Sequence, residues 1–593
     1  MRARRPVGEE TSARPRPHRY PCQDLCHHQR LAKTRPPVRP PADILIKNGL
    51  LVDPVMETAK RTDISLKDGK IFSYAPTRAE EVVDATGCYV SCGFIESHLH
   101  VEGLHLLPEN YAAAFLAHGT TTIVTDLHEI ANAGGLEGLL WYLSLIDGLP
   151  LDFFVMAPSS VPSSRFELGF GRIGLRGLRR LKASKRVIGL GEVMDVEGVI
   201  QRRRDVMGKI GLFEGRPVDG HAPGLSGSDL DLYLSAGIHS DHETTGTIEG
   251  MEKLKRGVHL FLREGSAAKD LLNLLPLIAP GHIPRLSLCA DDLSARDLFG
   301  QGHLDRMIGL LVSSGINLFR ALRLVTANPA LYFNLNDRNS LALGRTADLV
   351  VFDRPEKPRV RVTVKNGKIV YQDGQGLPCQ AKVRPRASAV LNVAPFSMDA
   401  LRQRPRGRKI RVMAVREGTI LVDEIEAEAR IENGYLAADH GRDIVLTYVF
   451  DRYRAEAEYG FGFVSGFSLK AGALATTYAH DSHNLIVIGD NMEDIYRVFQ
   501  ALKACGGGMA ASHQGVEVSL PMPFFGIISG LSSGEFLKKE AELDRVVRKM
   551  GVTLQNPFFQ MSFISLPVIP HLRLTAKGLF CVSTSTYVEA SYG

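Results

Sequence analysis

Two histidines spaced i, i+2 follow a short apolar run, His98 and His100 in GFIESHLHVEG (93–103). Side chains alternate faces along a strand, so both imidazoles would lie on one face. Neutral imidazole is a common metal ligand, and two on one face can share an ion. The pair alone is weak evidence, because polar residues are common at strand ends. Its meaning depends on the elements that position it.

Residues 93–335 alternate short apolar or β-branched runs with stretches long enough for helices. The runs are GFIESHLH (93–100), TTTIVTD (120–126), DFFVMAP (152–158), VIGLGEVM (187–194), RPVDGHAP (216–223), HSDHE (239–243), VHLFLRE (258–264) and LSLCADD (286–292). Eight strands with intervening helices predict an α/β fold, a (β/α)8 TIM barrel, although HSDHE has poor strand propensity. Almost every run ends in His, Asp or Glu, where such barrels carry their active sites.

Six side chains at these strand ends form a candidate metal set. They are His98, His100, Glu192, His221, His242 and Asp291. Four imidazoles and two carboxylates can hold two divalent ions, and Glu192 is the candidate bridge between ions roughly 3.5–4 Å apart. Mixed imidazole and carboxylate ligation suits Zn, Fe or Mn rather than Ca. Each histidine alone could be structural, but repeated placement at strand ends favours a metal site.

The predicted chemistry of this set is hydrolysis at an electrophilic carbon. A bound divalent ion lowers the pKa of water from 15.7 to about 7, so hydroxide is available at neutral pH. The carboxylate of Asp291 would take the proton of that water and pass it to the leaving group.

The barrel is predicted to be an insertion in a small β-domain. IKNGLLV (46–52) and VKNGKIV (364–370) read as the same strand–turn–strand phrase, once on each side of the barrel. A third region begins after about residue 385, with new strand-like segments such as TILVDEIEAEARI. The predicted organisation is a disordered Arg/Pro-rich tail at 1–41, a β-domain at 42–92 together with 336–385, the barrel at 93–335 and an α+β domain at 386–593.

The charge of the chain is concentrated in the amino-terminal tail. Residues 1–40 hold ten Arg/Lys and three Asp/Glu, so the remainder is close to neutral despite a formal net charge of +6. We therefore expect no nucleic-acid partner, and the lack of a long apolar run predicts no membrane span. The tail cluster Cys22, Cys26, His27, His28 lacks the second half of a zinc site. The eight cysteines form no framework, which fits a cytoplasmic protein, and we expect a homo-oligomer, most simply a dimer.

Several longer phrases resemble the adenine deaminases of the amidohydrolase superfamily. They are HGTTTIVTDLHEIANAGG (118–135), VIGLGEVMDVEGV (187–199), VDGHAPGLSGSDLDLYLSAGIHSDHETT (218–245), LREGSAAKDL (262–271), GFSLKAGALATTYAHDSHNLIVIGDN (466–491) and LPVIPHLRLTAKG (566–578). The resemblance runs from about 42 to 590. It implies conversion of adenine to hypoxanthine and ammonia, in purine salvage or adenine catabolism, at a binuclear Mn or Fe site.

Further residues take expected roles in this chemistry. Asp291 is the expected proton shuttle, and Glu129 in DLHEI is the hypothetical donor to a ring nitrogen, or its orienter, with His128 steadying the base. An exposed loop pair is the alternative for these two residues. The candidates for substrate binding are Glu102, His480, Asp481 and His483. The last three lie in AHDSHN, which is either a loop reaching over the barrel mouth or a polar turn before the strand LIVIG.

Departures from the family pattern keep alternative functions open. After Glu102 the chain has Gly103 and Leu104 where serines are usual, and Leu127 replaces a usual proline. These changes make another aminopurine or an N6-substituted adenine the nearest alternative substrate. A cyclic amide hydrolase of the hydantoinase or dihydroorotase type commonly bridges its metals with a lysine, and this fourth strand offers only Glu192. A non-catalytic scaffold should have lost ligands, whereas all six remain.

Overall fold

The computed structural model describes residues 40–593 except 76, 279–282, 339, 382–390, 395 and 457. Residues Ala42–Gly593 form one compact unit. The predicted disorder of the tail and its Cys22, Cys26, His27, His28 cluster lie outside the described residues. No helix in the described part of the chain has the length and apolar composition needed to cross a membrane.

Strands from both sides of residues 93–335 build two adjoining β-sheets. One sheet has the order β5-β4-β1-β6 and the other β20-β19-β18-β17-β7-β2-β3. Their strands are β1 (Ala42–Lys47), β2 (Leu50–Asp53), β3 (Thr58–Arg61), β4 (Ile64–Lys67), β5 (Lys70–Ser73), β6 (Ala79–Asp84), β7 (Tyr89–Cys92), β17 (Leu349–Asp353), β18 (Arg359–Lys365), β19 (Lys368–Gln372) and β20 (Gln375–Gly376). Strand β17 pairs antiparallel with β7, which joins the two sequence-distant segments in one sheet.

Each of the eight predicted runs contains a strand, and these strands form two parallel sheets. The larger sheet has the order β12-β11-β10-β9-β8-β16 and the smaller β13-β14-β15. The strands are β8 (Phe94–His100), β9 (Thr120–Asp126), β10 (Asp152–Ala157), β11 (Val187–Val193), β12 (Val218–Gly220), β13 (Ser240–Asp241), β14 (His259–Arg263), β15 (Leu286–Cys289) and β16 (Asp291–Asp292). The last run divides at Ala290: β15 pairs with β14, and β16 pairs with β8.

Helices of this region alternate with the strands and cover them. They are α1 (Pro108–Ala117), α2 (His128–Leu145), α3 (Leu175–Lys182), α4 (Val196–Ile200), α5 (Arg204–Leu212), α6 (Gly227–Leu234), α7 (Thr247–Lys255), α8 (Ala295–Gln301), α9 (Leu304–Ser313), α10 (Leu318–Arg323) and α11 (Ala327–Tyr332). Every residue of β8 and β9 is buried, as expected for parallel strands covered on both faces. The region is therefore α/β, with two parallel sheets, and the candidate metal residues lie at or directly after the ends of several of their strands.

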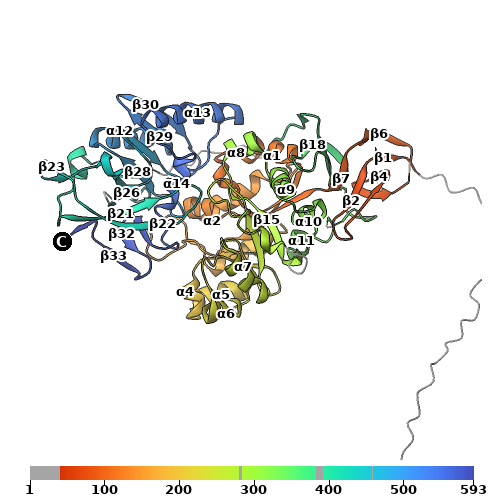
Figure 1. Cartoon of the computed structure of the whole chain (residues 1–593), viewed down its shortest axis with the longest axis horizontal. Coiled ribbons are helices and arrows are strands. Elements are labelled where there is room, and N and C mark those ends of the chain that lie inside the picture. The colour runs from red at the N-terminus through yellow and green to blue at the C-terminus, as the bar shows by residue number, and fades with distance from the viewer. Residues whose placement is uncertain are drawn as a thin grey trace, which may run out of the picture. The chain divides into compact units, whose positions relative to one another are not determined.

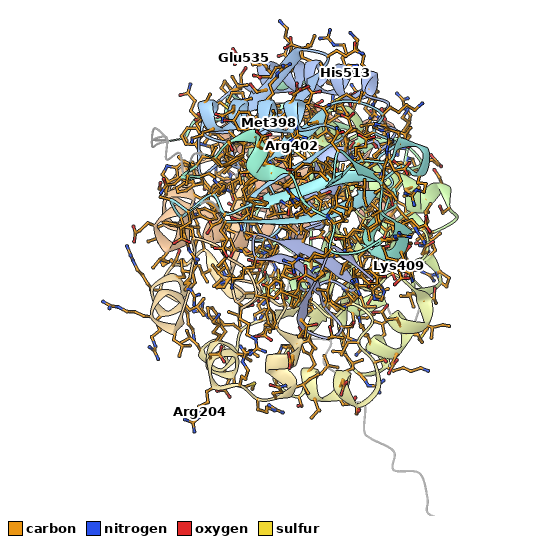
Figure 2. The ribbon with its side chains drawn as sticks, turned by 90° about the vertical axis from the view of Figure 1, so that its left-hand side faces the viewer. Arg204, Met398, Arg402, Lys409, His513 and Glu535 are labelled. Atoms are coloured by element: carbon orange, nitrogen blue, oxygen red, sulfur yellow. The ribbon has the colours of Figure 1, made fainter. Side chains whose placement is uncertain are left out.

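The carboxyl-terminal region has its own mixed sheet, of order β22-β21-β26-β25-β28-β27-β29-β30, with β34 beside β21. Its elements are β21 (Lys409–Val415), β22 (Val422–Glu428), β23 (Ile431–Glu432), β24 (Tyr435–Leu436), β25 (Val445–Phe450), β26 (Tyr459–Ser465), β27 (Ala473–Thr476), β28 (Leu485–Gly489), α12 (Met492–Cys505), β29 (Gly508–His513), β30 (Val516–Pro521), α13 (Ser533–Lys549), α14 (Pro557–Phe563), β31 (Leu572–Thr575), β32 (Gly578–Cys581), β33 (Thr586–Val588) and β34 (Ser591–Tyr592). Helices α12 and α13 lie over β29 and β30 (Figure 1). Charged side chains such as Lys409 and Glu535 project from the surface of this region (Figure 2).

The carboxyl-terminal region packs directly on the parallel-strand region. The ring of Trp141 in α2 stacks on Phe524, with ring centroids 5.6 Å apart. The Asn484 side-chain amide donates a hydrogen bond of 2.6 Å to the carbonyl of Leu168. These contacts bring the AHDSHN segment toward the carboxyl ends of the parallel strands.

A buried lysine holds the weakest strand in place. Nζ of Lys253 in α7 contacts Oδ2 of Asp241 at 2.9 Å and Oε1 of Glu249 at 2.6 Å, and its side chain is fully buried. It also donates to the carbonyl of Ala222 at 2.7 Å, next to His221. Strand β13 has only two residues, so these contacts, rather than strand propensity, position the segment that carries His242.

Replacing Lys253 with Ala is expected to destabilise the protein by about 3–5 kcal/mol, because Asp241 would stay buried without a counter-charge. Calorimetry should show a lower Tm, and the metal content of the purified protein should fall. Lys255→Ala is the matched control, since Lys255 is exposed on the same helix. Equal melting temperatures for the two variants would contradict this role of Lys253.

Candidate metal centre

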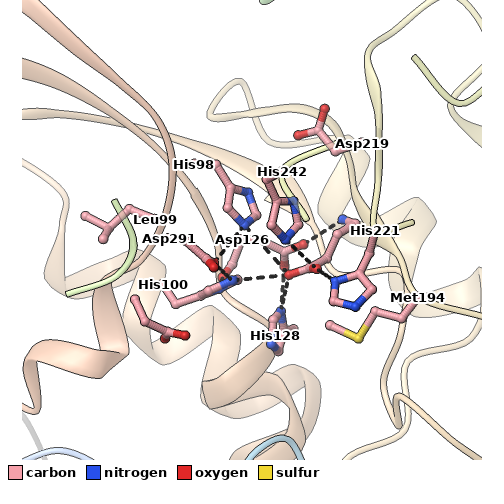
Figure 3. Close-up of polar contacts among 12 residues, drawn as sticks. His98, Leu99, His100, Asp126, His128, Met194, Asp219, His221, His242 and Asp291 are labelled. Atoms are coloured by element: carbon pink, nitrogen blue, oxygen red, sulfur yellow. Dashed lines mark hydrogen bonds and ion pairs between the residues drawn. The ribbon is translucent and has the colours of Figure 1, made fainter. Parts of the chain in front are cut away.

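The structure gathers all six predicted metal ligands at the carboxyl ends of the parallel strands. His98 and His100 lie on β8, Glu192 on β11 and Asp291 on β16, while His221 and His242 directly follow β12 and β13. Figure 3 shows the four imidazoles pointing toward one another. All six residues are at most 6% exposed. The strand-end rule therefore located the members of one cluster.

The Glu192 carboxylate lies between two pairs of imidazoles. Oε1 is 3.8 Å from Nε2 of His98 and 3.2 Å from Nε2 of His100. Oε2 is 2.8 Å from Nδ1 of His221 and 3.3 Å from Nε2 of His242. Each carboxylate oxygen thus faces its own histidine pair, as a bridging ligand between two ions would.

Asp291 completes the first half of this arrangement. Its Oδ1 is 3.4 Å from Nε2 of His98 and 3.2 Å from Nε2 of His100. Adjacent ligand atoms around an ion about 2.1 Å away lie about 3.0–3.4 Å apart, which is close to these separations. Among the described residues, Nε2 of His98 and Oε1 of Glu192 have no hydrogen-bond partner. The donor set therefore fits two divalent cations better than a hydrogen-bonded polar core.

Electrostatics keep both carboxylates ionised. Burial works to raise the pKa of Glu192, but the charge of His242 and the contacts with His100 and His221 lower that pKa well below its usual range. Burial likewise opposes ionisation of Asp291, and its contacts with His100 and His98 lower its pKa well below the usual range. Ionised carboxylates beside imidazoles favour binding of a divalent cation.

Asp126 orients two of the candidate ligands. Its Oδ2 accepts a 2.9 Å hydrogen bond from the backbone N–H of Glu192, and its carbonyl lies 3.0 Å from Nδ1 of His100, so Nε2 of His100 faces the centre. A Cβ on Gly191 would lie 1.9 Å from Oδ2 of Asp126, so only glycine permits this approach. Sequence reasoning did not name Asp126, although it ends the run TTTIVTD and obeys the strand-end rule.

Arg263 is a second residue that sequence reasoning missed. It is fully buried at the end of β14, and Nη1 lies 2.7 Å from Oε1 of Glu243 and 3.1 Å from Oδ2 of Asp291. Nη2 lies 3.0 Å from Asp270. Arg263 therefore holds the outer oxygen of Asp291 while the inner oxygen faces the histidines. A cation in a strand-end run was the only signal for it.

A second buried cluster adjoins the metal centre. Nδ1 of His128 lies 3.4 Å from Oε1 of Glu192, and its Nε2 lies 3.4 Å from Oε1 of Glu129. Nδ1 of His480 contacts the same oxygen of Glu129, and Nε2 of His483 lies 2.5 Å from Oε2. Asp481 Oδ1 is 3.8 Å from Nε2 of His128. The AHDSHN segment is a buried polar turn before β28, and it reaches the strand ends.

One cavity lies over the metal centre. Its lining residues are His100, His128, Glu192, Met194, His221, His242, Glu243, Asp291, Asp292, Ile420, His480, Asp481, Phe563, Leu566 and Ile569. The carboxyl-terminal region therefore supplies a largely apolar roof. A neighbouring cavity between residues 163–166 and 567–570 shares Met194 and His221 with it.

Of the predicted substrate and catalytic residues, Glu102, Glu129 and His483 are not among the described residues that line the first cavity. Oε1 of Glu102 accepts a 3.1 Å hydrogen bond from the backbone N–H of Ile130, in the first turn of α2. Burial raises the pKa of Glu102 to about 7. Glu102 and Glu129 thus lie behind the cavity wall, whereas His128, His480 and Asp481 form part of that wall.

Two family models match different regions of this chain. Residues 89–370 match the Amidohydrolase family, and residues 419–586 match the Adenine deaminase C-terminal domain. Among solved structures, a β-aspartyl dipeptidase from Fervidobacterium islandicum AW-1 superposes with a TM-score of 0.45 at 19% identity, covering 56% of this chain and 98% of that chain.

Relatives named adenine deaminase match nearly the whole chain. Adenine deaminase 2 of Carboxydothermus hydrogenoformans is 36% identical over 554 residues, which are 93% of this chain and 97% of that protein. Adenine deaminase of Syntrophobacter fumaroxidans is 37% identical over 556 residues, covering 92% and 96%. With both regions matched in one continuous chain, this protein belongs to the adenine deaminase family of amidohydrolases.

Proposed function

We propose that this chain hydrolyses adenine to hypoxanthine and ammonia, acting on the carbon–nitrogen bond of a cyclic amidine. The observation that carries the proposal is the Glu192 carboxylate shared between two histidine pairs, beneath a cavity roofed by the carboxyl-terminal region. The relatives that match both regions are named adenine deaminase. Salvage or catabolism of purines is the corresponding cellular role.

The proposed cofactors are two Mn²⁺ or Fe²⁺ ions. His98, His100 and Asp291 would hold one, His221 and His242 the other, and Glu192 would bridge them. When bound, such ions make hydroxide available near neutral pH. Imidazole and carboxylate ligands suit Mn and Fe as well as Zn, so the loaded metal depends on availability in the cell.

The proposed roles of the chain's own residues follow from their positions. Asp291 takes the proton of the attacking water and passes it to the amino group of adenine, with Arg263 fixing its outer oxygen. The roof residues Phe563, Leu566 and Ile569 exclude bulk water and pack on the faces of the base. His128 and Asp481 line the wall beside the reacting carbon.

We also propose the finer organisation of the chain. The two parallel sheets form one closed (β/α)8 barrel at 93–335, supported by the hydrogen bond from the His239 N–H to the carbonyl of Val218, which links the start of β13 to β12. The split β-domain comprises 42–92 and 336–385, and the carboxyl-terminal domain comprises 386–593. A cytoplasmic homodimer is the proposed setting of the enzyme.

Ammonia release from adenine tests the function. The Mn-loaded protein should release ammonia from adenine, and a metal-stripped sample should not. A purine panel in the same assay compares adenine with N6-substituted adenines, other aminopurines and a hydantoin. If a protein holding two ions turns over one of these compounds and not adenine, that compound is the substrate and the proposal for adenine is wrong.

Replacing Asp291 with Asn should lower kcat by at least about 100-fold, since the proton transfer to the leaving amine is lost. The amide keeps an oxygen ligand, so two ions per chain should remain bound. Metal analysis and kcat measured on one preparation check both parts. Retained turnover would remove Asp291 as the proton shuttle.

Replacing Glu192 with Gln should reduce the metal content below two ions per chain, because a neutral amide bridges two cations poorly. Inductively coupled plasma mass spectrometry after dialysis measures the content. Glu197→Gln is the matched control, since Glu197 lies five residues on, outside the metal centre. Two tightly held ions in the Glu192 variant would refute the bridging role.

A further inference from the structure

We infer that His480, contributed by the carboxyl-terminal region, is a catalytic residue that protonates a ring nitrogen of the substrate, with Glu129 and His483 as its positioning residues. The inference rests on the proposed deamination and deepens it. It also moves the donor role, predicted for Glu129, to the histidine that Glu129 contacts.

The two nitrogens of His480 face different surroundings. Nδ1 contacts Oε1 of Glu129, away from the cavity. Nε2 has no hydrogen-bond partner among the described residues and lies on the cavity side, 3.8 Å from Oδ1 of Asp292. The ring stacks on Phe563 with centroids 4.5 Å apart and an interplanar angle of 17°. His480 therefore has one nitrogen engaged by a carboxylate and one free for a ligand.

Glu129 is itself held from its other side. Its Oε2 lies 2.5 Å from Nε2 of His483, and Nδ1 of His483 accepts a 3.3 Å hydrogen bond from the backbone N–H of Ala479. In neutral His483 the proton is therefore on Nε2, facing Glu129. A carboxylate fixed in this way selects the tautomer and orientation of His480, as the carboxylate of a Ser-His-Asp triad does for its histidine.

Other groups on the cavity wall are less suited to this role. His128 faces carboxylates with both nitrogens: Nδ1 with Glu192, and Nε2 with Glu129 at 3.4 Å and Asp481 at 3.8 Å. His221 and His242 belong to the proposed metal ligands. His480 and His128 are the described lining histidines outside the proposed metal ligands, and of these two only His480 has a ring nitrogen more than 3.5 Å from every described carboxylate oxygen.

Charge supports a protonated His480. Burial lowers its pKa, but the carboxylates of Glu129 and Asp292 outweigh burial and raise the pKa well above its usual range. A protonated imidazole presents an N–H donor at Nε2.

The wall offers a pattern that matches one edge of adenine. Nε2–H of His480 is a donor and Oδ1 of Asp292 is an acceptor beside it. In adenine, N1 is an acceptor and the adjacent amino group is a donor. Guanine and hypoxanthine carry a carbonyl oxygen in place of that amino group and a protonated N1, so both contacts would be mismatched. The same pair would thus discriminate substrate from product.

The proton transfers balance. As oxygen forms its bond to carbon 6, the π electron pair of the C6–N1 bond moves to N1, which takes the proton from Nε2 of His480. Asp291 gives the amino group the proton that it took from water, and the C6–N bond breaks with its electron pair on ammonia. The added hydroxyl becomes the carbonyl, and its proton replaces the one lost by His480. One water is consumed and one ammonia released.

The first test compares His480→Phe with the wild type, both loaded with Mn. Phenylalanine keeps a planar ring against Phe563 but has no donor. We expect kcat for adenine to fall at least about 100-fold with two ions still bound. His571→Gln, at an exposed histidine of the same region, should match the wild type. Wild-type kcat in a His480→Phe protein that holds two ions overturns the inference.

Ligand binding gives a second readout that does not depend on turnover. Calorimetric titration with purine and with 1-deazapurine compares a ring carrying N1 with one lacking it. The wild type should bind purine more tightly, and His480→Phe should bind both equally. Equal binding by the wild type, or an undiminished preference in the variant, overturns the contact between His480 and N1. His480→Leu, which also has no donor, replaces the Phe variant if that variant fails to fold.

Glu129→Gln tests the positioning role. We expect a lower kcat with little change in KM, and no further loss of kcat when it is combined with His480→Phe. Additive losses contradict action through His480. A third ion that is bound by the wild type and lost in Glu129→Gln would show a different role for this cluster. The metal would then be held by His128, Glu129, His480 and Asp481.

A wild type that is inactive on adenine defeats the proposed function. An active wild type together with an active His480 variant defeats only this inference.

Discussion

The arrangement of the site depends on one buried carboxylate, that of Glu192. A carboxylate in a low-dielectric interior requires positive partners, because its desolvation is otherwise too costly. Four of its imidazole neighbours come from three different strands or the segments that follow them, and a fifth, His128, begins α2. The relative positions of those strands are therefore constrained by a single side chain, and Asp126 and Gly191 in turn constrain the backbone of Glu192.

The metal centre and the carboxyl-terminal region form one continuous buried ionic network. His128 lies between Glu192 and Glu129, and Glu129 lies between two histidines of the AHDSHN segment. In this network, Glu192 and Glu129 each have imidazoles beside them, and Glu192 also has the proposed cations. The contacts that pack the two regions together are therefore also the contacts that balance the buried charges of the site. The site residues are buried because they lie at this junction.

The six candidate metal residues could be grouped from the sequence because the signal for each of them is local. Each ligand ends, or directly follows, a short apolar run, and parallel strands bring such ends together. Strand β13 has poor strand propensity, and only the regular alternation of strand-like and helix-length segments around it predicts a strand there. Its position depends on the long-range contacts of Lys253.

The relation between Glu129 and His480 could not be read in this way. The two residues are about 350 positions apart, and nothing in either segment tells which of them faces the cavity. The same holds for Glu102, whose carboxylate contacts a helix turn behind the wall rather than the ligand space. The direction of a side chain at a junction between regions is decided by tertiary packing, and local patterns carry little information about it.

The second cavity, between residues 163–166 and 567–570, reaches Met194 and His221 beside the metal centre. Its two walls belong to different regions of the chain, so the width of this passage depends on how closely those regions approach. A base that reaches the metal centre through this cavity would pass between the two walls, so entry of the base and departure of the product would both depend on how these regions pack.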